Sequence, residues 1–84
     1  MDDKTNIADR VRQIVAEVLD EPVSAMDANP VLAAHEWDSR VSLEALAQLE
    51  AAFVVTVDLR SFHAARTVND LVDLVIRSQP TPTR

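Results

Sequence analysis

The sequence predicts an all-α protein, a small four-helix bundle with a long first loop and a short third helix. Three stretches repeat apolar residues at the 3.6-residue period of an α-helix. The β-rich run at residues 54–57 has no second such run to pair with, so we interpret it as an extended connector with alternate side chains buried. At 84 residues, 48% of them hydrophobic, the chain suits one globular domain.

The first helix is expected to begin near Asn6, after a short tail of residues 1–5, and to end at Leu19 or Asp20. Its inward face is a continuous stripe of branched apolar residues: Ile7, Val11, Ile14, Val15 and Val18. Pro22 cannot continue a helix and is expected to end it.

Residues 21–37 are expected to form a long loop, because Ser, Asp, Asn and Pro recur along them. Loops of this length are uncommon in compact domains unless they pack against the core or have a function. Four apolar side chains are expected to hold this loop against the bundle: Val23, Met26, Val31 and Leu32.

The central helix begins at the Asp38-Ser39 pair and continues to Phe53 without Gly or Pro. Asp38 is a good N-cap, because its carboxylate can accept from the free N–H groups of the first turn. The apolar face is formed by Leu46, Leu49 and Phe53, with Leu43 at its edge, and the opposite face by Arg40, Glu44, Ala47, Gln48 and Ala51. Ser39 therefore lies near solvent, at the positive end of the helix dipole.

Two further helices follow the connector. A short one begins at Asp58, which can cap it, and ends near His63. The last begins at Thr67, whose capping box uses Asp70 in place of the usual Glu. Its inner face is apolar: Val68, Leu71, Val72, Leu74 and Val75. Residues 78–84 are polar and contain Pro, so we expect a disordered tail.

Composition excludes several classes of function. The net charge of −6 argues against binding nucleic acid, and the absence of Cys and Gly excludes thiolate metal sites and glycine-rich phosphate loops. No apolar run approaches the roughly 20 residues of a membrane span, so no membrane contact is expected. The first four residues lack the basic start and apolar stretch of a signal peptide. We therefore expect a cytoplasmic protein, and a monomer.

Two segments carry a family resemblance: Trp37-Asp38-Ser39 opens the central helix, and a Leu-Glu-Ala-Ala-Phe run at residues 49–53 closes it. They resemble the acyl carrier protein family, whose signature is an Asp-Ser pair at the start of the second of four helices. The resemblance covers roughly residues 6–77, which would be the carrier domain. Arg40 departs from the pattern, because the family usually has Leu after the Ser.

The resemblance implies that Ser39 is esterified by a 4′-phosphopantetheine arm, which a phosphopantetheinyl transferase adds from coenzyme A. Asp38 would then be both helix cap and recognition acid. The protein would not be an enzyme. It would tether an acyl or aminoacyl group as a thioester and present it to acyltransferase, ligase or ketosynthase-type partners. The residues expected to contact partners are Trp37, Arg40, Glu44, Ala47, Gln48 and His63.

The exposed face of the central helix indicates which carrier this is. Fatty-acid carriers resemble one another in a strongly acidic second helix, whereas this face mixes Arg40 and Glu44 with small side chains. That favours a discrete carrier of polyketide or related antibiotic-type biosynthesis. Two alternatives stay open: a housekeeping fatty-acid carrier, and a small helical interaction module whose Ser39 is never modified.

The aromatic and histidine residues around Ser39 have competing interpretations. Trp37 either closes the loop against the bundle or contacts the arm. His35 could border the partner surface together with Glu36. A Ser-His-Asp triad using Ser39, Asp38 and either His35 or His63 is disfavoured, because adjacent Ser and Asp cannot easily place an imidazole between them.

Overall fold

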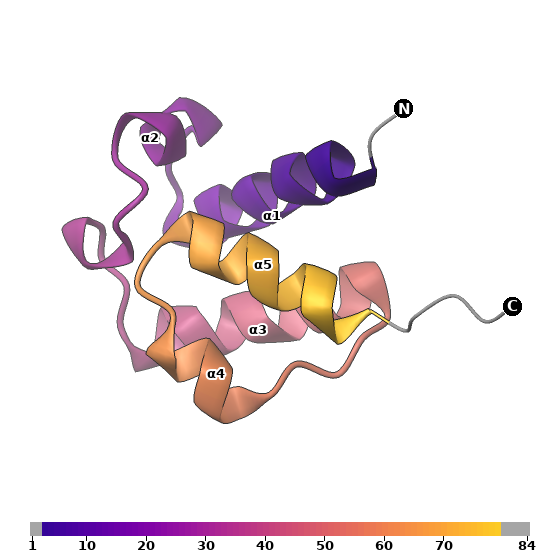
Figure 1. Ribbon diagram of the computed structural model, residues 1–84. Coiled ribbons are helices and arrows are strands. Elements are labelled where there is room, and N and C mark those ends of the chain that lie inside the picture. Colours follow the sequence, from indigo (N-terminus) through magenta and orange to yellow (C-terminus); the bar gives the residue numbers. More distant parts are fainter. Residues whose placement is uncertain (1–2, 80–84) are drawn as a thin grey trace, which may run out of the picture.

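A computed structural model describes residues 3–79 and confirms the all-α fold class (Figure 1). Its elements are α1 (Asp3–Leu19), α2 (Val23–Ala28), a 3₁₀ turn (Leu32–Ala34), α3 (Ser39–Phe53), α4 (Leu59–Ala64) and α5 (Val68–Ser78). Within these described residues there is no strand, only an isolated antiparallel bridge between Val31 and Thr67. Most of the predicted tail at residues 78–84 lies outside the described residues. Its first residue, Ser78, belongs to α5 instead.

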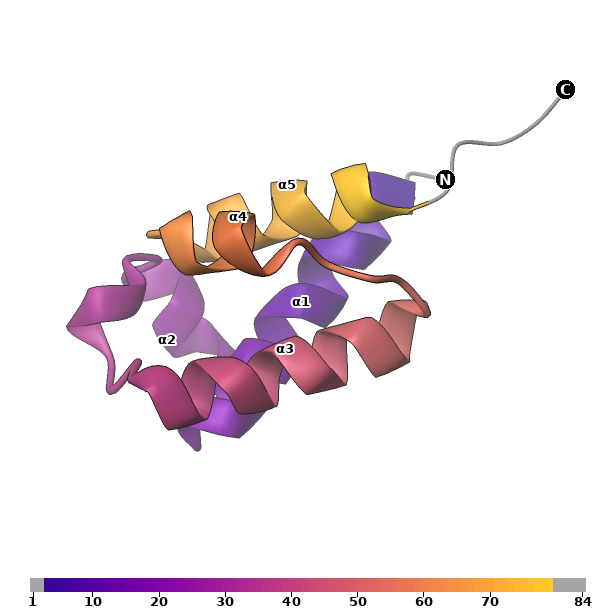
Figure 2. The same cartoon turned by 90° about the horizontal axis from the view of Figure 1, so that it is seen from below.

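Helix α1 packs against α5, α3 and α2, and α4 packs against α5 (Figure 2). The predicted α1 stripe forms the middle of the core: Val11, Ile14 and Val15 are buried, and Ile7 and Val18 are half-buried against them. All five predicted inner residues of α5 are buried as well. The apolar periodicity of these two helices therefore identified the larger part of the core.

Helix α1 starts at Asp3, so residues 3–5 belong to a helix rather than to the expected tail. The helix ends at Leu19, as predicted, but the cause of its end differs from the expectation. Asp20 adopts the left-handed conformation with φ 59°, and the N–H groups of Asp20 and Glu21 donate to the carbonyls of Glu17 and Ala16. This is a Schellman termination with Asp where Gly is usual. The helix therefore ends three residues before Pro22, which instead occupies the N-cap position of α2.

The predicted long loop contains helical structure, and the bundle thus has five α-helices in its described part rather than four. Met26 of α2 and Leu32 of the 3₁₀ turn are buried, as expected for residues that hold this segment down. Val23 and Val31 are substantially exposed and do not have that role. A six-residue helix is too short to form alone, so burial of Met26 accounts for α2.

Helices α4 and α5 begin as predicted. Asp58 accepts from the N–H of Ser61, and Thr67 and Asp70 form the capping box with both reciprocal bonds present. The hydroxyl and N–H of Ser61 hold the pKa of Asp58 below its usual value. The backbone N–H of Arg66 lowers the pKa of Asp70 in the same direction.

The buried face of α3 is narrower than predicted. Ser42, Ala45 and Leu49 are buried, whereas Leu46 and Phe53 are only half-buried. Leu43, expected at the edge of the core, is 50% exposed. Two of the three buried side chains of α3 are therefore small, and Leu46 and Phe53 pack against the core only in part.

The connector after α3 behaves as expected, with Val55 and Val57 turned inward and Thr56 outward. It is fixed at one point by a side chain of α3, because the Val57 N–H donates to the Glu50 carboxylate at 2.8 Å. Val54, which ends α3 in the left-handed conformation, is 86% exposed.

Candidate functional site

Ser39 is the first residue of α3 and is exposed. The preceding Asp38 is the predicted cap: its carboxylate accepts from the Val41 N–H at 2.9 Å, and its carbonyl accepts from the Ser42 N–H at 2.8 Å. The buried Ser42 hydroxyl donates to the carbonyl of Ser39 at 3.0 Å. Backbone and side-chain bonds thus fix the first turn while the Ser39 hydroxyl faces solvent.

This arrangement fits a phosphate ester on Ser39. The first N–H groups of a helix have no intrahelical acceptor, and the dipole of a 15-residue helix favours negative charge at this end. The Asp38 carboxylate occupies the Val41 N–H and leaves the first N–H groups of the turn free for an anion. The exposed guanidinium of Arg40 follows directly and adds positive charge.

The segment that leads to Ser39 is joined to the turn between α4 and α5. The Leu32 N–H donates to the Arg66 carbonyl at 3.0 Å, and the Val68 N–H donates to the Pro30 carbonyl at 2.8 Å. Consequently one end of the bundle gathers α2, the 3₁₀ turn, the start of α3 and the start of α5 (Figures 1 and 2). Ser39 lies at this end of the bundle, where hydrogen bonds join the segment before it to the α4–α5 turn.

His35 lies in the same segment. We expected it to border the partner surface, but its side chain is only 8% exposed, so that expectation is wrong. Its Nε2 is 2.8 Å from the Asn29 carbonyl, and its Nδ1 is 2.8 Å from the Glu21 carboxylate. The carbonyl of Asn29, followed by the Glu21 carboxylate, raises the pKa of His35, while burial acts in the opposite direction. Glu36, its neighbour, is exposed.

Trp37 is half-buried and packs on α4. Its ring centroid is 6.2 Å from that of Phe62, and the two planes are tilted by 51°. Phe62 in turn meets His63 edge-on at 5.9 Å, with His63 exposed. The structure therefore supports the interpretation of Trp37 as a ring that closes the loop, with His63 beside Phe62 on α4.

The outer face of α3 carries the other predicted residues. Arg40, Glu44 and Ala47 are exposed, and Gln48 is half-buried. Leu43 was not among the predicted partner residues, yet it is one turn beyond Ser39 and is 50% exposed. Its signal was available, since residues four apart share a helix face.

A Ser-His-Asp triad is absent from the described residues. Both ring nitrogens of His35 are engaged by Glu21 and Asn29, and the Asp38 carboxylate is bound to the Val41 N–H. His35 is therefore not free to act as a base toward Ser39.

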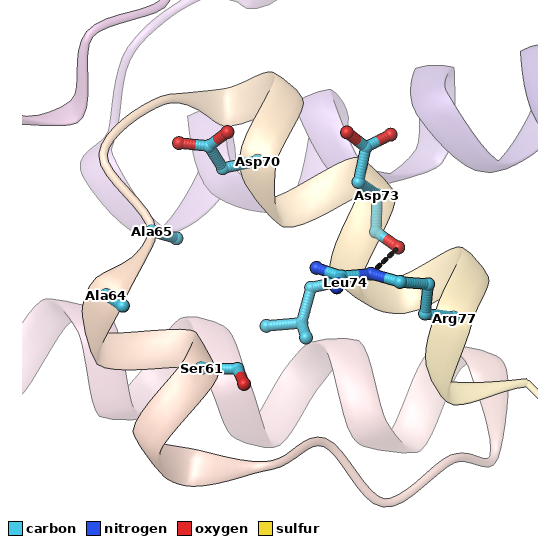
Figure 3. A pocket seen from close by; sticks show the side chains of 7 residues that line it. All are labelled: Ser61, Ala64, Ala65, Asp70, Asp73, Leu74 and Arg77. Carbon is cyan, nitrogen blue, oxygen red and sulfur yellow. Dashed lines mark hydrogen bonds between the residues drawn. The ribbon is translucent and has the colours of Figure 1, made fainter.

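The hollow found on the surface, about 300 Å³ in volume, lies elsewhere. It is formed between α4 and α5, and Asp70, Asp73 and Arg77 line it together with Ala64, Ala65, Leu74 and Ser61 (Figure 3). Arg77 donates from Nε to the carbonyl of Asp73 at 3.4 Å, along its own helix. None of the predicted site residues lines this groove.

Two negative findings apply to the part of the chain that the structure describes. No helix in residues 3–79 is long and apolar enough to cross a membrane. In the same span, no three His, Cys, Asp or Glu side chains gather as they would around a metal ion.

Comparison with known protein families agrees with the fold. A family model described as a phosphopantetheine attachment site matches residues 9–75, from α1 to α5, whereas a search of curated proteins finds no match. Members of the matched family bind 4′-phosphopantetheine covalently and act with phosphopantetheinyl transferases and biosynthetic enzymes as carriers rather than catalysts. With the all-α bundle, this match shows that the chain belongs to the phosphopantetheine-binding carrier family, of acyl carrier protein type.

Proposed function

We propose that Ser39 is the residue that carries the 4′-phosphopantetheine arm. The observation behind this proposal is the place of Ser39: an exposed hydroxyl in the first turn of α3, next to a capping acid and within the matched residues 9–75. In the transfer, the Ser39 oxygen attacks the phosphorus of coenzyme A that bears pantetheine. The pyrophosphate bond breaks, adenosine 3′,5′-bisphosphate leaves, and a base of the transferase takes the hydroxyl proton.

The arm supplies a thiol at its far end, to which an acyl or aminoacyl cargo is attached as a thioester. The residues of this chain then have two tasks. Asp38 holds the first turn of α3 so that Ser39 keeps its position, and the bonds from Pro30 and Leu32 to the α4–α5 turn hold the approaching segment. Neither task requires a proton transfer at the carrier.

We assign partner docking to the outer face of α3 with its neighbour on α4: Trp37, Arg40, Glu44, Ala47, Gln48 and His63, to which the exposed Leu43 is now added. Among these residues Arg40 is positive and Glu44 negative, and the others are aromatic, polar or apolar without an acidic group. Partners of the acyltransferase, ligase or ketosynthase type would therefore recognise it through shape and a carboxylate opposite Arg40, rather than through bulk acidity.

The same mixed charge favours a discrete carrier of polyketide or related antibiotic-type biosynthesis over a housekeeping fatty-acid carrier. A strongly acidic recognition helix meets basic patches on many enzymes, whereas a specific pair selects few partners. A monomer working in the cytoplasm, where coenzyme A is at hand, completes this proposal.

Intact-mass measurement after incubation with coenzyme A and a broad-specificity transferase tests the attachment. The wild type should gain the mass of one phosphopantetheine, and Ser39→Ala should gain none while keeping its helical circular dichroism. Ser61→Ala is the matched control, because Ser61 is also exposed in the first turn of a helix capped by Asp. It should load like the wild type.

An unchanged wild-type mass, under conditions that load a control carrier, would support an unmodified interaction module instead. Loading of Ser39→Ala at the wild-type level would show that the arm is attached elsewhere.

A further inference from the structure

His35 makes two hydrogen bonds that a neutral imidazole cannot make together. Its Nε2 faces the carbonyl oxygen of Asn29 and its Nδ1 faces a carboxylate oxygen of Glu21, both at 2.8 Å. Both partners are acceptors only. A neutral ring has one N–H, so one of the two contacts would bring two lone pairs together, whereas the imidazolium donates to both.

The two acceptors belong to different parts of the fold. Glu21 follows the Schellman end of α1, and Asn29 is the residue that ends α2. His35 itself follows the 3₁₀ turn, and its carbonyl accepts from the Trp37 N–H at 2.8 Å. The ring thus ties the end of α1 and the end of α2 to the segment whose next residues are Trp37, the cap Asp38 and Ser39.

We propose that the His35 imidazolium is a proton-dependent clasp that positions the segment leading to Ser39. Its role in positioning a loaded Ser39 rests on the proposed attachment at Ser39. The two hydrogen bonds of the clasp do not depend on that proposal. With the clasp closed, the approach to the first turn of α3 has one conformation. When the ring loses its proton, one of the two bonds is lost and residues 35–38 gain freedom.

The charges around the ring favour the closed form. Glu21 is the ionisable group that contacts it, and Glu36 and Asp38, which follow in the sequence, add negative charge from the exposed side of the same segment. Asp27 of α2 faces Arg12 of α1 at 3.6 Å, so that carboxylate is shared with a cation. The Arg66 carbonyl contacts this segment at Leu32, whereas the Arg66 side chain is exposed.

The direction of the pH dependence follows from these contacts. The Asn29 carbonyl, with Glu21, raises the pKa of His35 in the folded protein. A group whose pKa is raised by folding stabilises the fold fully below its unfolded value of about 6.5. That contribution is lost as the pH rises through the folded value. The clasp is therefore closed in mild acid and opens on the alkaline side.

The first test is a titration of the ring, followed by ¹H–¹⁵N correlation of its two nitrogens in the His63→Gln variant. His35 is then the sole histidine, so its signals need no assignment. In the folded protein both nitrogens should stay protonated to a higher pH than in the same variant unfolded in urea. A folded midpoint equal to or below the unfolded one would overturn the clasp.

A pair of carboxylate variants then tests the contact. Glu21→Gln keeps an acceptor at Nδ1 but removes its charge, so the folded midpoint of His35 should fall. Glu36→Gln is the matched control, since Glu36 is next to His35 in sequence but exposed, and it should shift the midpoint less. Equal shifts in the two variants would mean that Glu21 is only one of several diffuse charges, against the proposal.

The link to Ser39 has a readout without any enzyme. The backbone amide signals of Asp38 and Ser39 should titrate with the midpoint of His35, and this coupled shift should vanish in His35→Gln. Amide signals that ignore the His35 midpoint would refute the positioning role.

Loading by the transferase gives the functional readout. The ratio of kcat/KM for wild type to that for His35→Gln should be several-fold at low pH and approach one above the folded midpoint. A ratio that is constant with pH would indicate a structural residue and contradict the proposal. If the wild type is not loaded at all, the proposed function fails, while the ring and amide titrations still decide the clasp.

Discussion

Helices α3 and α5 both pack against α1, yet they bury different kinds of side chain. The 11 residues of α5 bury five large apolar side chains, whereas the 15 residues of α3 bury one, Leu49, beside the small Ser42 and Ala45. α5 therefore supplies much of the cohesion of the bundle. α3 is held by Leu49, by the half-buried Leu46 and Phe53 and by its Asp38 cap, and its exposed side chains include Ser39, Arg40, Leu43 and Glu44.

Replacing a leucine by alanine should show the largest difference in stability between α5 and α3. Leu71 of α5 is 1% exposed, so Leu71→Ala should lower the free energy of unfolding by about 2–5 kcal/mol. Leu43 of α3 is 50% exposed, and Leu43→Ala should cost less than about 1 kcal/mol. Urea melts of both variants measure these values. Similar losses at the two positions would mean that α3 is as deeply embedded as α5.

A substitution at the end of α3 should instead increase the free energy of unfolding. Val54 holds the left-handed conformation, with φ 53°, although it is β-branched and almost fully exposed. Val54→Gly removes the clash of its Cβ, loses little apolar burial, and should raise the free energy of unfolding by about 1 kcal/mol.

Asp20→Gly is the matched control for that change, because Asp20 ends α1 in the same conformation, which Asp tolerates well. Its gain should be smaller, and a denaturant titration of both variants compares them. A loss of stability in Val54→Gly would show that the backbone there is relaxed.

The smallest effect on stability is expected at Arg40, where a change should affect function instead. Arg40→Leu removes a positive charge from the positive end of α3, so the melting temperature should stay level or rise slightly. The free energy of unfolding should change by no more than about 0.5 kcal/mol. Transfer by a cognate acyltransferase or ligase should slow, because the proposed carboxylate opposite Arg40 loses its partner.

The same substitution at Arg60, the second residue of α4 as Arg40 is of α3, serves as the control. Measured with one partner enzyme, kcat/KM should fall for Arg40→Leu and change less for Arg60→Leu. Equal values for Arg40→Leu and the wild type would make Arg40 a passive surface residue.

The sequence by itself determined the features that depend on neighbours three or four residues away. The apolar stripes of α1 and α5, the caps Asp38 and Asp58, and the Thr67 capping box are all of this kind, and so is the exposed place of Ser39 in a first turn. Such features are local, because a helix repeats every 3.6 residues and its caps bond within one turn.

Only the tertiary structure decided the features that need a distant partner. Helix α2 exists because Met26 is buried against the rest of the bundle, and Leu43 is exposed although Leu49 of the same helix is buried in the core. His35 looked like a surface residue until the fold brought Glu21, 14 residues earlier, to its ring. Spacing along the chain carries no record of such contacts, since they depend on how α1, α2 and the segment before Ser39 pack together.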